Sequence, residues 1–305
     1  MSNPLNSKYF EQVRLLIDIL PLIAQNPHFA LKGGTAINLF VFDMPRLSVD
    51  IDLCYLPLTD RDQALNDIHQ FIRSLSERIE SLGLQVREQK NTEGLESTLF
   101  VQSKKIEIKI EINLVVRGAV YPPVLRKLSP IVQDRFKRDV EVLCLDDRDL
   151  FAGKICAALD RQHPRDFFDL WMYFKTFSYT LELHQTLMVY LLSSKRPIAE
   201  LIKPNFLDIT SRYHSQFEGM TSIAVNPKIL EETRTALFEK VLSSFTEQDK
   251  QFLISFKQGE PQWDLLSIQQ VKHFPAVQWK LHNIRNINTV KRQKAIAALR
   301  DTLRC

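Results

Sequence analysis

The chain has 305 residues, of which 45% are hydrophobic and 25% are charged, and its formal net charge is +4. This length and apolar content suffice for one large domain or two ordinary ones, and eight glycines and fourteen prolines are too few for a linker-rich or low-complexity protein. The four cysteines are widely spaced, and the sequence has no C-x-x-C motif. This pattern predicts neither a zinc site nor a disulfide framework.

The first predicted element is an amphipathic helix over residues 8–25. Its apolar positions recur at helical spacing: Val13, Leu15, Leu16, Ile17, Leu20 and Ile23. The first ten residues, "MSNPLNSKYF", lack the basic and apolar regions of a secretory signal. Asp18 and Pro21 interrupt the most apolar stretch of the chain, which argues against a membrane span. We therefore expect a cytoplasmic protein.

A short strand "FAL" at residues 29–31 then leads into Gly33 and Gly34, which open a brief helix "TAINLFVF" that ends before Pro45. The first turn of a helix offers free backbone N–H groups and the positive end of the helix dipole, both of which attract an anion. A diglycine is more often only a tight turn, so this motif alone does not identify a phosphate site.

Two aspartates follow inside the apolar strand "LSVDIDLCYL", residues 47–56. Because side chains alternate along a strand, Asp50 and Asp52 share one face, with Cα atoms roughly 6–7 Å apart. If their carboxylates come within about 5 Å, the repulsion costs on the order of 3 kcal/mol at an effective dielectric near 20. Water, basic side chains or a bound cation can relieve that repulsion, and hard divalent cations prefer oxygen ligands.

A long helix is expected next, capped by Thr59 and continuing to about Leu82, with Gly83 after it. Strands follow near Val86, at 97–102 and at 105–116. In "KIEIKIEINLVV" the isoleucines Ile106, Ile108, Ile110 and Ile112 occupy one face, and Glu107, Lys109, Glu111 and Asn113 occupy the other. If this strand neighbours the aspartate strand, Glu107 or Glu111 could supply a third carboxylate, and three convergent carboxylates suit two metal ions.

"VEVLCL" at residues 140–145 is the last predicted strand, and nearly everything after Asp147 has helical period. We therefore predict an α+β fold with an α/β domain over 1–146 and a helical domain over 147–305. The last residues are basic: Lys272, Lys280, Arg285, Lys291, Arg292, Lys294, Arg300 and Arg304 against Asp301 give +7, so the rest of the chain is close to −3. Such an end could contact a phosphate backbone or be a solvated helix face.

One stripe of the predicted helix "DLFAGKICAALDR" carries Lys154, Ala157, Ala158 and Arg161 at i, i+3, i+4 and i+7. A lysine there could neutralise triphosphate charge in a transition state, or simply lie along its own helix. Asp166 and Asp169 follow Pro164 at the beginning of the next helix, where acids can simply favour the helix N-terminus.

In combination, "KGGTAINLF", "RLSVDIDL", "IKIEIN" and "DLFAGKICAALDRQHPRDFFDL" resemble the AbiEii/MenT-type nucleotidyltransferase toxins of the DNA polymerase β-like nucleotidyltransferase superfamily. The resemblance implies a nucleotidyltransferase-type mixed sheet with flanking helices, followed by a helical domain that contributes Lys154 and Asp166 to the site. The fifteen residues between the diglycine and Asp50 exceed the generic superfamily spacing and match the extra turn of this family.

The resemblance also implies roles for individual residues. Asp50, Asp52 and Glu111 would bind two Mg²⁺ ions, although Glu107 shares the face of Glu111. The nucleotide-binding residues would be Lys32, Gly33, Gly34, Thr35, Arg46 and Lys154, and the catalytic set would be Asp50, Asp52, Glu111, Lys154 and Asp166. Thr35 stands where the family more often has serine.

The implied activity is transfer of a nucleoside monophosphate from an NTP to RNA, with the 3′ end of tRNA as the expected acceptor. The protein would then be the toxin of a bacterial toxin–antitoxin system that defends against phage by abortive infection, with an antitoxin protein as partner. Two alternatives remain: the acceptor of the nucleotidyl or phosphoryl group is a protein hydroxyl, or the chain is a non-catalytic nucleotide-binding scaffold.

Overall fold

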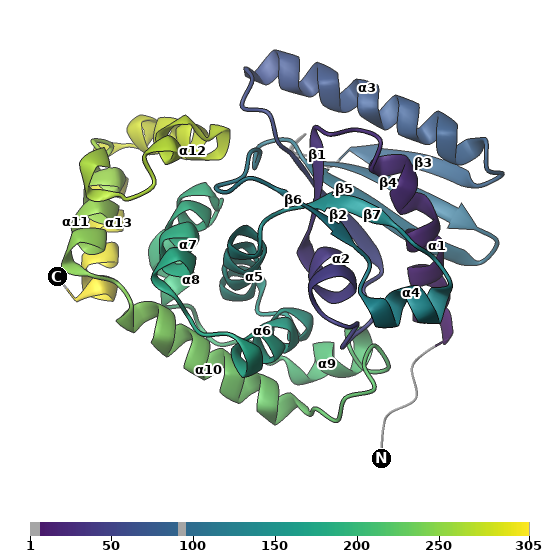
Figure 1. The fold of residues 1–305 in the computed structure, drawn as a ribbon. Helices are drawn as coiled ribbons and strands as arrows, with labels where there is room; N and C mark the ends of the chain where they lie inside the picture. The colour runs from purple at the N-terminus through teal and green to yellow at the C-terminus, as the bar shows by residue number, and fades with distance from the viewer. Residues whose placement is uncertain (1–6, 91–95, 305) are drawn as a thin grey trace. The chain divides into compact units, whose positions relative to one another are not determined.

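The computed structural model describes residues 7–90 and 96–304 (Figure 1). They form a seven-stranded mixed sheet with flanking helices and a helical region, which confirms the predicted α+β class. The strands are β1 Phe29–Lys32, β2 Asp50–Tyr55, β3 Gln85–Lys90, β4 Glu96–Ser103, β5 Ile106–Asn113, β6 Val124–Lys127 and β7 Glu141–Cys144.

The helices of the first half are α1 Ser7–Ile23, α2 Gly33–Ala36, α3 Arg61–Glu80 and α4 Pro130–Phe136, and a π-helical turn, η1 Ile37–Val41, continues α2. The later helices are α5 Asp147–Arg161, α6 Pro164–Thr176, α7 Leu181–Ser193, α8 Ile198–Ile202, α9 Thr210–Gln216, α10 Pro227–Ser243, α11 Glu247–Gln258, α12 Pro275–Asn286 and α13 Thr289–Leu303. Two 3₁₀ turns, η2 Trp263–Leu265 and η3 Gln269–His273, precede α12. Within the described residues, no helix has both the length and the apolar character needed to cross a membrane.

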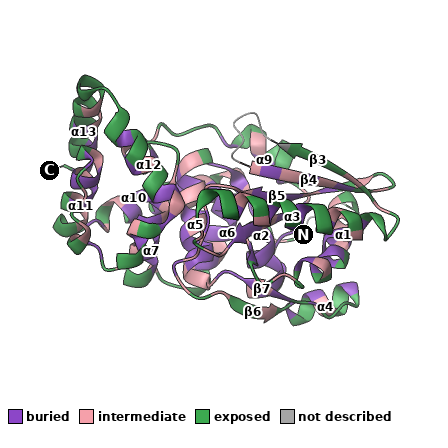
Figure 2. Cartoon of the chain, turned by 90° about the horizontal axis from the view of Figure 1, so that it is seen from above, coloured by how far each residue is buried: buried purple, intermediate pink, exposed green. Residues whose placement is uncertain are grey.

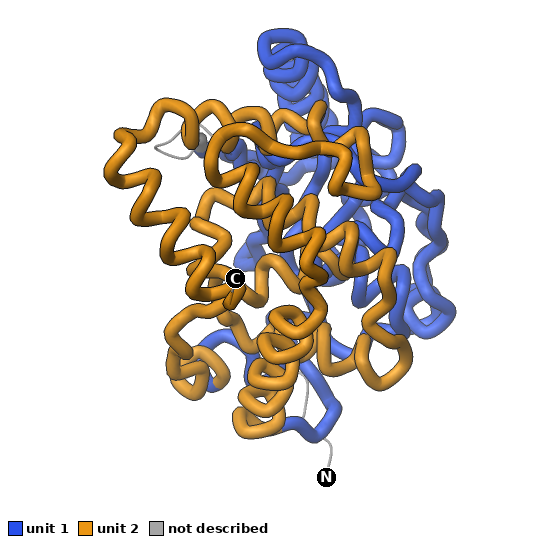
Figure 3. The backbone as a smooth tube through the Cα atoms, turned by 90° about the vertical axis from the view of Figure 1, so that its left-hand side faces the viewer, with its two compact units in different colours: residues 1–150, 214–225 blue, residues 151–213, 226–305 orange. Residues whose placement is uncertain are grey.

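The chain divides into two compact units (Figure 3). Unit 1 comprises residues 1–150 and 214–225, and unit 2 comprises residues 151–213 and 226–305. The sheet belongs to unit 1, and α6, α7 and α10–α13 belong to unit 2. The sequence-based domain boundary near residue 146 stays a prediction.

The sheet order is β3-β4-β5-β2-β1-β7-β6. β2 lies between β1, which runs antiparallel to it, and β5, which runs parallel to it. In this register Lys32 pairs with Asp52, and Asp52 pairs with Glu111 on its other side. Two residues earlier on β2, Asp50 pairs with Lys109 of β5. The register therefore places the charged positions of three neighbouring strands side by side on one face.

The opposite face of these strands is the core of unit 1. Ile51 and Leu53 of β2 are fully buried, and Ile110 of β5 retains 1% exposure. α3 covers this face, where Phe71 stacks on Phe29 of β1 with ring centroids 3.9 Å apart. Figure 1 shows α3 and α2 on opposite sides of the strands. Because the apolar alternation fixes which side faces α3, the charged residues of β2 and β5 must face away from it.

The N-terminal cap of α3 corrects the sequence prediction. The cap is Asp60 and not Thr59, because the Asp60 carboxylate accepts the backbone N–H groups of Asp62 and Gln63, each at 3.0 Å. Both residue types are good caps, and the sequence alone did not distinguish the two neighbours. The helix itself and the strands at 97–102, 105–116 and 140–145 agree with the prediction, whereas β6 and α4 were not predicted.

A segment far along the chain fixes the loop that precedes β2. The backbone N–H of Leu47 donates to the carbonyl of Met220 at 2.7 Å. The Thr221 hydroxyl donates to the carbonyl of Pro45, also at 2.7 Å. Residues 214–225 thus belong to unit 1 because they hydrogen-bond to the loop that leads into Asp50.

Candidate functional site

The acidic residues of the predicted site lie on adjacent strands at the centre of the unit 1 sheet. Asp50 and Asp52 lie on β2, and Glu111 on β5 is the direct neighbour of Asp52. The side chain of Asp50 keeps 23% of its exposure and that of Glu111 keeps 36%, so solvent still reaches this face. The pattern D-x-D on one strand and E on its neighbour therefore becomes a cluster of three acidic side chains on adjacent strands.

The two glutamates that the sequence left open occupy different places. Glu111 lies beside Asp52, whereas Glu107 is four residues earlier on β5 and pairs with Gln102 of β4. The Glu107 side chain is exposed, and its backbone carbonyl accepts the Gln12 side-chain amide. Of the two, Glu111 is the residue that the sheet brings to the aspartates.

Lys109 is the cation of this cluster, and the sequence analysis gave it no role. Its Nζ lies 3.2 Å from Glu111 Oε1 and 3.8 Å from Asp50 Oδ1. Burial lowers the pKa of Lys109, but the carboxylates of Asp50 and Glu111 outweigh it and leave that pKa raised. Burial, and next the Asp52 carboxylate, raise the pKa of Glu111 above its ordinary value, although Lys109 opposes this. Like-charge repulsion is therefore present at the cluster and is only partly relieved by one lysine.

Position 33 requires a glycine because the Asp52 side chain leaves no room there for a Cβ atom. Gly33 has φ +70°, a left-handed conformation that favours glycine, and a Cβ built there would overlap Asp52 Oδ2. Gly34 is enclosed on another side, where a Cβ would lie 2.6 Å from Arg46 Nη2 and 2.8 Å from Ser48 Oγ. The diglycine thus brings bare backbone directly against the carboxylate cluster.

The polar side chains of Thr35, Asn38 and Arg46 surround the diglycine segment. Thr35 is fully buried, and its hydroxyl donates to the Asp50 carbonyl at 2.5 Å and lies 3.1 Å from Ser48 Oγ. The Asn38 amide donates to the Gly34 carbonyl at 2.9 Å. Arg46, 3% exposed, donates to the Leu47 carbonyl at 2.9 Å. The Thr35 contact ties α2 to β2, and the Arg46 guanidinium lies against Gly34, so the side chains of Thr35 and Arg46 act in this structure as supports of the diglycine and Asp50.

Lys154 and Asp166 form a separate buried cluster within unit 2. Lys154 Nζ, on α5, lies 3.0 Å from Asp166 Oδ1 and 2.9 Å from Asp169 Oδ2, both on α6. Arg161 adds a bidentate contact to Asp166, at 2.6 Å and 2.9 Å. Burial raises the pKa of Asp166, but Lys154 and Arg161 outweigh it and hold that pKa far below its usual range. The cluster joins α5 to α6, most of whose first two turns is buried (Figure 2), and the nucleotide role of Lys154 and Asp166 stays a prediction.

The donor chemistry of the unit 1 cluster suits a hard divalent cation, because its three carboxylates present only oxygen atoms. Within residues 7–90 and 96–304, no three His, Cys, Asp or Glu side chains are close enough together to form a ready metal site. The position between Asp50 and Glu111 is taken by the ammonium group of Lys109. The residues therefore fit a metal ion by type and location, and Lys109 is the group that such an ion would displace.

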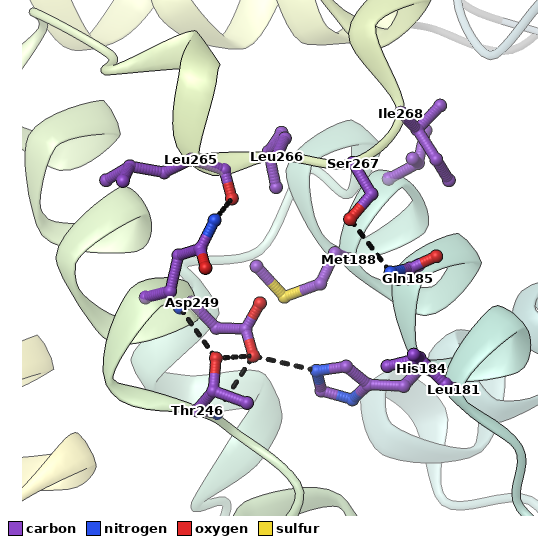
Figure 4. Close-up of a pocket in the computed structure, with 12 residues that line it drawn as sticks. Leu181, His184, Gln185, Met188, Thr246, Asp249, Leu265, Leu266, Ser267 and Ile268 are labelled. Atoms are coloured by element: carbon purple, nitrogen blue, oxygen red, sulfur yellow. Dashed lines mark hydrogen bonds and ion pairs between the residues drawn. The ribbon is translucent and has the colours of Figure 1, made fainter.

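Unit 2 also contains a small cavity of about 130 Å³ between α7, α11 and residues 265–268 (Figure 4). His184 lies in its wall and bridges Tyr179 and Asp249, with Nδ1 3.1 Å from the Tyr179 hydroxyl and Nε2 3.2 Å from Asp249 Oδ2. Asp249 also completes a capping box with Thr246 at the start of α11. Because the contact between His184 and Asp249 joins α7 to α11, the cluster is a structural link between these two helices.

Comparison with known proteins supports an assignment to one family. A family model described as "Nucleotidyl transferase AbiEii toxin, Type IV TA system" matches residues 14–283. Among solved structures, the chain is similar to MenT4, a nucleotidyltransferase toxin from Mycobacterium tuberculosis H37Rv, with a TM-score of 0.62 and 14% sequence identity. That likeness covers 91% of this chain and 93% of MenT4, and at this identity it concerns the fold. A comparison with curated proteins gave no match.

We expect Gly33→Ala to destabilise unit 1 and disorganise the carboxylate cluster. The left-handed backbone alone costs an alanine about 1–2 kcal/mol, and the added methyl group must also move the Asp52 side chain. Gly83→Ala is the matched control, because Gly83 has φ +78° and a Cβ there meets nothing within 4 Å. Thermal unfolding of the two variants measures the difference, and equal losses of stability would contradict the close contact between Gly33 and Asp52.

Asp166→Asn should cost about 3–5 kcal/mol of folding free energy at pH 7, because it leaves Lys154 and Arg161 facing a neutral side chain in a buried site. The folded pKa of Asp166 lies below its unfolded value near 3.9, so its contribution is present above that pH and is lost as pH falls further. The difference between parent and variant should therefore shrink as pH falls below about 4. Asp160→Asn, at a surface pair with Arg196, should cost less than about 1 kcal/mol at any pH.

Proposed function

The chain belongs to the AbiEii family of nucleotidyltransferase toxins from type IV toxin–antitoxin systems, and we propose that it transfers a nucleoside monophosphate from an NTP to an RNA hydroxyl in a Mg²⁺-dependent reaction. The observation that carries this proposal is the placement of Asp50, Asp52 and Glu111 on adjacent strands, next to the half-buried backbone of Gly33. A carboxylate cluster and an anion-accepting backbone are the two parts that a metal–triphosphate complex requires.

In the proposed reaction the acceptor hydroxyl oxygen attacks the α-phosphorus of the NTP. A new P–O bond forms, the bond from the α-phosphorus to the oxygen that bridges to the β-phosphate breaks, and pyrophosphate leaves with that oxygen. The hydroxyl proton passes to solvent or to a carboxylate of the cluster. No oxidant or reductant is needed, so catalysis consists of positioning the two reactants and stabilising charge.

Each part of unit 1 has a place in this scheme. Asp50, Asp52 and Glu111 would hold Mg²⁺, which when bound lowers the pKa of the attacking hydroxyl and neutralises charge on the phosphates. The N–H groups at the start of α2 would bind the β- and γ-phosphates, and Lys32, the neighbour of Asp52 in the sheet, would add a positive charge to this part of the site. Thr35 and Arg46 would act indirectly, by holding β2 and the diglycine in position through their contacts with them.

RNA is the proposed acceptor, and the 3′ end of tRNA is the form that the family resemblance implies. The basic segment of residues 271–305 carries a charge of +7 and supports a polyanionic partner. Nucleotides added to a tRNA 3′ end would block its aminoacylation and halt growth, which is how we propose that the toxin restricts phage infection. The type IV system supplies a cognate antitoxin.

Label transfer to RNA tests this proposal. Purified protein with a tRNA pool, Mg²⁺ and each α-labelled NTP should give labelled RNA, and Glu111→Gln should lower the rate at least about 100-fold because it removes a proposed metal ligand. Glu107→Gln, on the same strand and the same face, should keep the parent's rate. Label on protein in place of RNA, or equal rates for the two glutamine variants, would refute the assignment.

Removal of Lys109 tests the metal site without any turnover. In EDTA, Lys109→Met should lower folding stability by up to about 1 kcal/mol, since the three carboxylates lose their half-exposed counterion. Added Mg²⁺ or Mn²⁺ should stabilise this variant more than the parent, because no ammonium group competes for the carboxylates. Lys105→Met, in the exposed turn between β4 and β5, is the control and should match the parent in both titrations. A lack of metal response in both the parent and Lys109→Met would argue against the site.

A further inference from the structure

An exposed aromatic pair lies on α12 of unit 2. Trp279 keeps 54% of its exposure, although tryptophan is usually well covered. Its ring lies nearly parallel to that of His282, with an interplanar angle of 17° and centroids 5.9 Å apart. Asn286, one turn further, contacts His282 Nε2 at 2.9 Å and fixes the imidazole. The helix thus presents an ordered, flat aromatic surface to solvent.

Two arginines converge beside this pair. Arg285 of α12 donates from Nε to the carbonyl of Gly259 at 2.9 Å. A Cβ on Gly259 would lie 3.3 Å from Arg285 Cγ and 3.8 Å from Nη1 of Arg292 on α13, so both side chains pass over this glycine. The carbonyl end of α11 offsets part of their repulsion, and each guanidinium has further N–H donors. A phosphate group would satisfy two such neighbouring guanidinium groups.

The other charged residues of the basic segment, residues 271–305, differ from these two arginines in what they contact. Lys280 donates to the carbonyls of Leu191, Ser194 and Arg196, and burial lowers its pKa to about 8. It closes the end of α7 and contributes little to an external ligand. The carboxylate of Asp301, the acid of this segment, lies 3.7 Å from the ammonium group of Lys203, which follows α8. The α12 face and the start of α13 therefore remain positive, with aromatic and amide side chains among the charges.

We propose that the face formed by Trp279, His282, Asn286, Arg285 and Arg292, called here the α12 surface, binds unpaired nucleotides of RNA. A base stacks on the indole of Trp279, and the adjoining phosphate contacts the two arginines. Trp279 and Arg285 are six residues apart, about 9 Å along the helix axis, which suits neighbouring groups of one strand. Base stacking requires an unpaired nucleotide, so a single strand is bound more tightly than a duplex.

The charge of the segment favours RNA over a protein as the occupant. Residues 271–305 carry eight basic side chains against one acid, an excess of positive charge that a polyanion matches and that a protein partner would have to neutralise. The inference rests on the proposed RNA acceptor and adds where, and in which form, that RNA is held. It concerns binding only and is independent of the metal cluster in unit 1.

The test is equilibrium binding of a fluorescent twelve-nucleotide single-stranded RNA to the full chain, in EDTA and without NTP. Trp279→Ala should weaken binding roughly 5- to 150-fold, the range measured for loss of one base–aromatic stack, and should leave the salt dependence unchanged. Trp279→Phe retains a ring and should stay within about threefold of the parent. The same RNA annealed to its complement should bind more weakly to the parent and respond less to Trp279→Ala.

The arginine pair is tested by salt dependence. Arg285→Gln combined with Arg292→Gln should reduce the slope of log K against log salt by about 0.7, because the two arginines share one phosphate and each phosphate contact on a single strand contributes about 0.7. Lys228→Gln combined with Lys240→Gln removes the same charge from α10 and should leave the slope within error of the parent.

Unchanged RNA affinity in Trp279→Ala overturns the proposal, and a changed oligomeric state with unchanged affinity would identify the face as a protein contact. RNA binding that depends on Trp279 in a protein that transfers no label would contradict only the transferase proposal. Label transfer that is indifferent to Trp279 and to both arginines would contradict only the α12 surface.

Discussion

The contact between Gly33 and Asp52 is the constraint on which the candidate site depends. The backbone at the start of α2 approaches the carboxylate so closely that no side chain fits between them, and the positive φ of Gly33 directs the chain into the helix at that point. This contact therefore fixes how closely the start of α2, which follows β1, lies to β2. An anion bound to the helix start and a cation bound to the aspartates would be neighbours as a direct result of this contact.

Much of this arrangement follows from local patterns. Alternation along β2 and β5 correctly separated the buried isoleucines from the charged positions, because one face of each strand must pack against α1 and α3. The same alternation could not choose between Glu107 and Glu111, since a period of two places both on one face. That choice is made by the parallel pairing of β5 with β2, a contact between strands about 60 residues apart in the sequence that no local pattern records.

The features of the candidate site that the sequence did not predict are side-chain contacts between different elements. Thr35 is enclosed by Ser48 and the Asp50 carbonyl, and the lysine that meets the acidic cluster is Lys109, which looked like one more charge on an exposed face. Lys154 looked available for a ligand, but in unit 2 its ammonium group already contacts two buried aspartates. A motif identifies the residue type and its element, and the partners of that residue depend on how distant elements pack.

The return of residues 214–225 to unit 1 has a genetic consequence. The chain passes from one unit to the other after residues 150, 213 and 225, so neither unit is encoded by one uninterrupted stretch of gene. A nonsense or frameshift mutation upstream of codon 220 deletes Met220 and Thr221, and with them the hydrogen bonds that hold the loop before Asp50. A host can therefore escape such a toxin through mutations far downstream of the carboxylate codons, and an intact "VDIDL" in a truncated gene does not indicate a working protein.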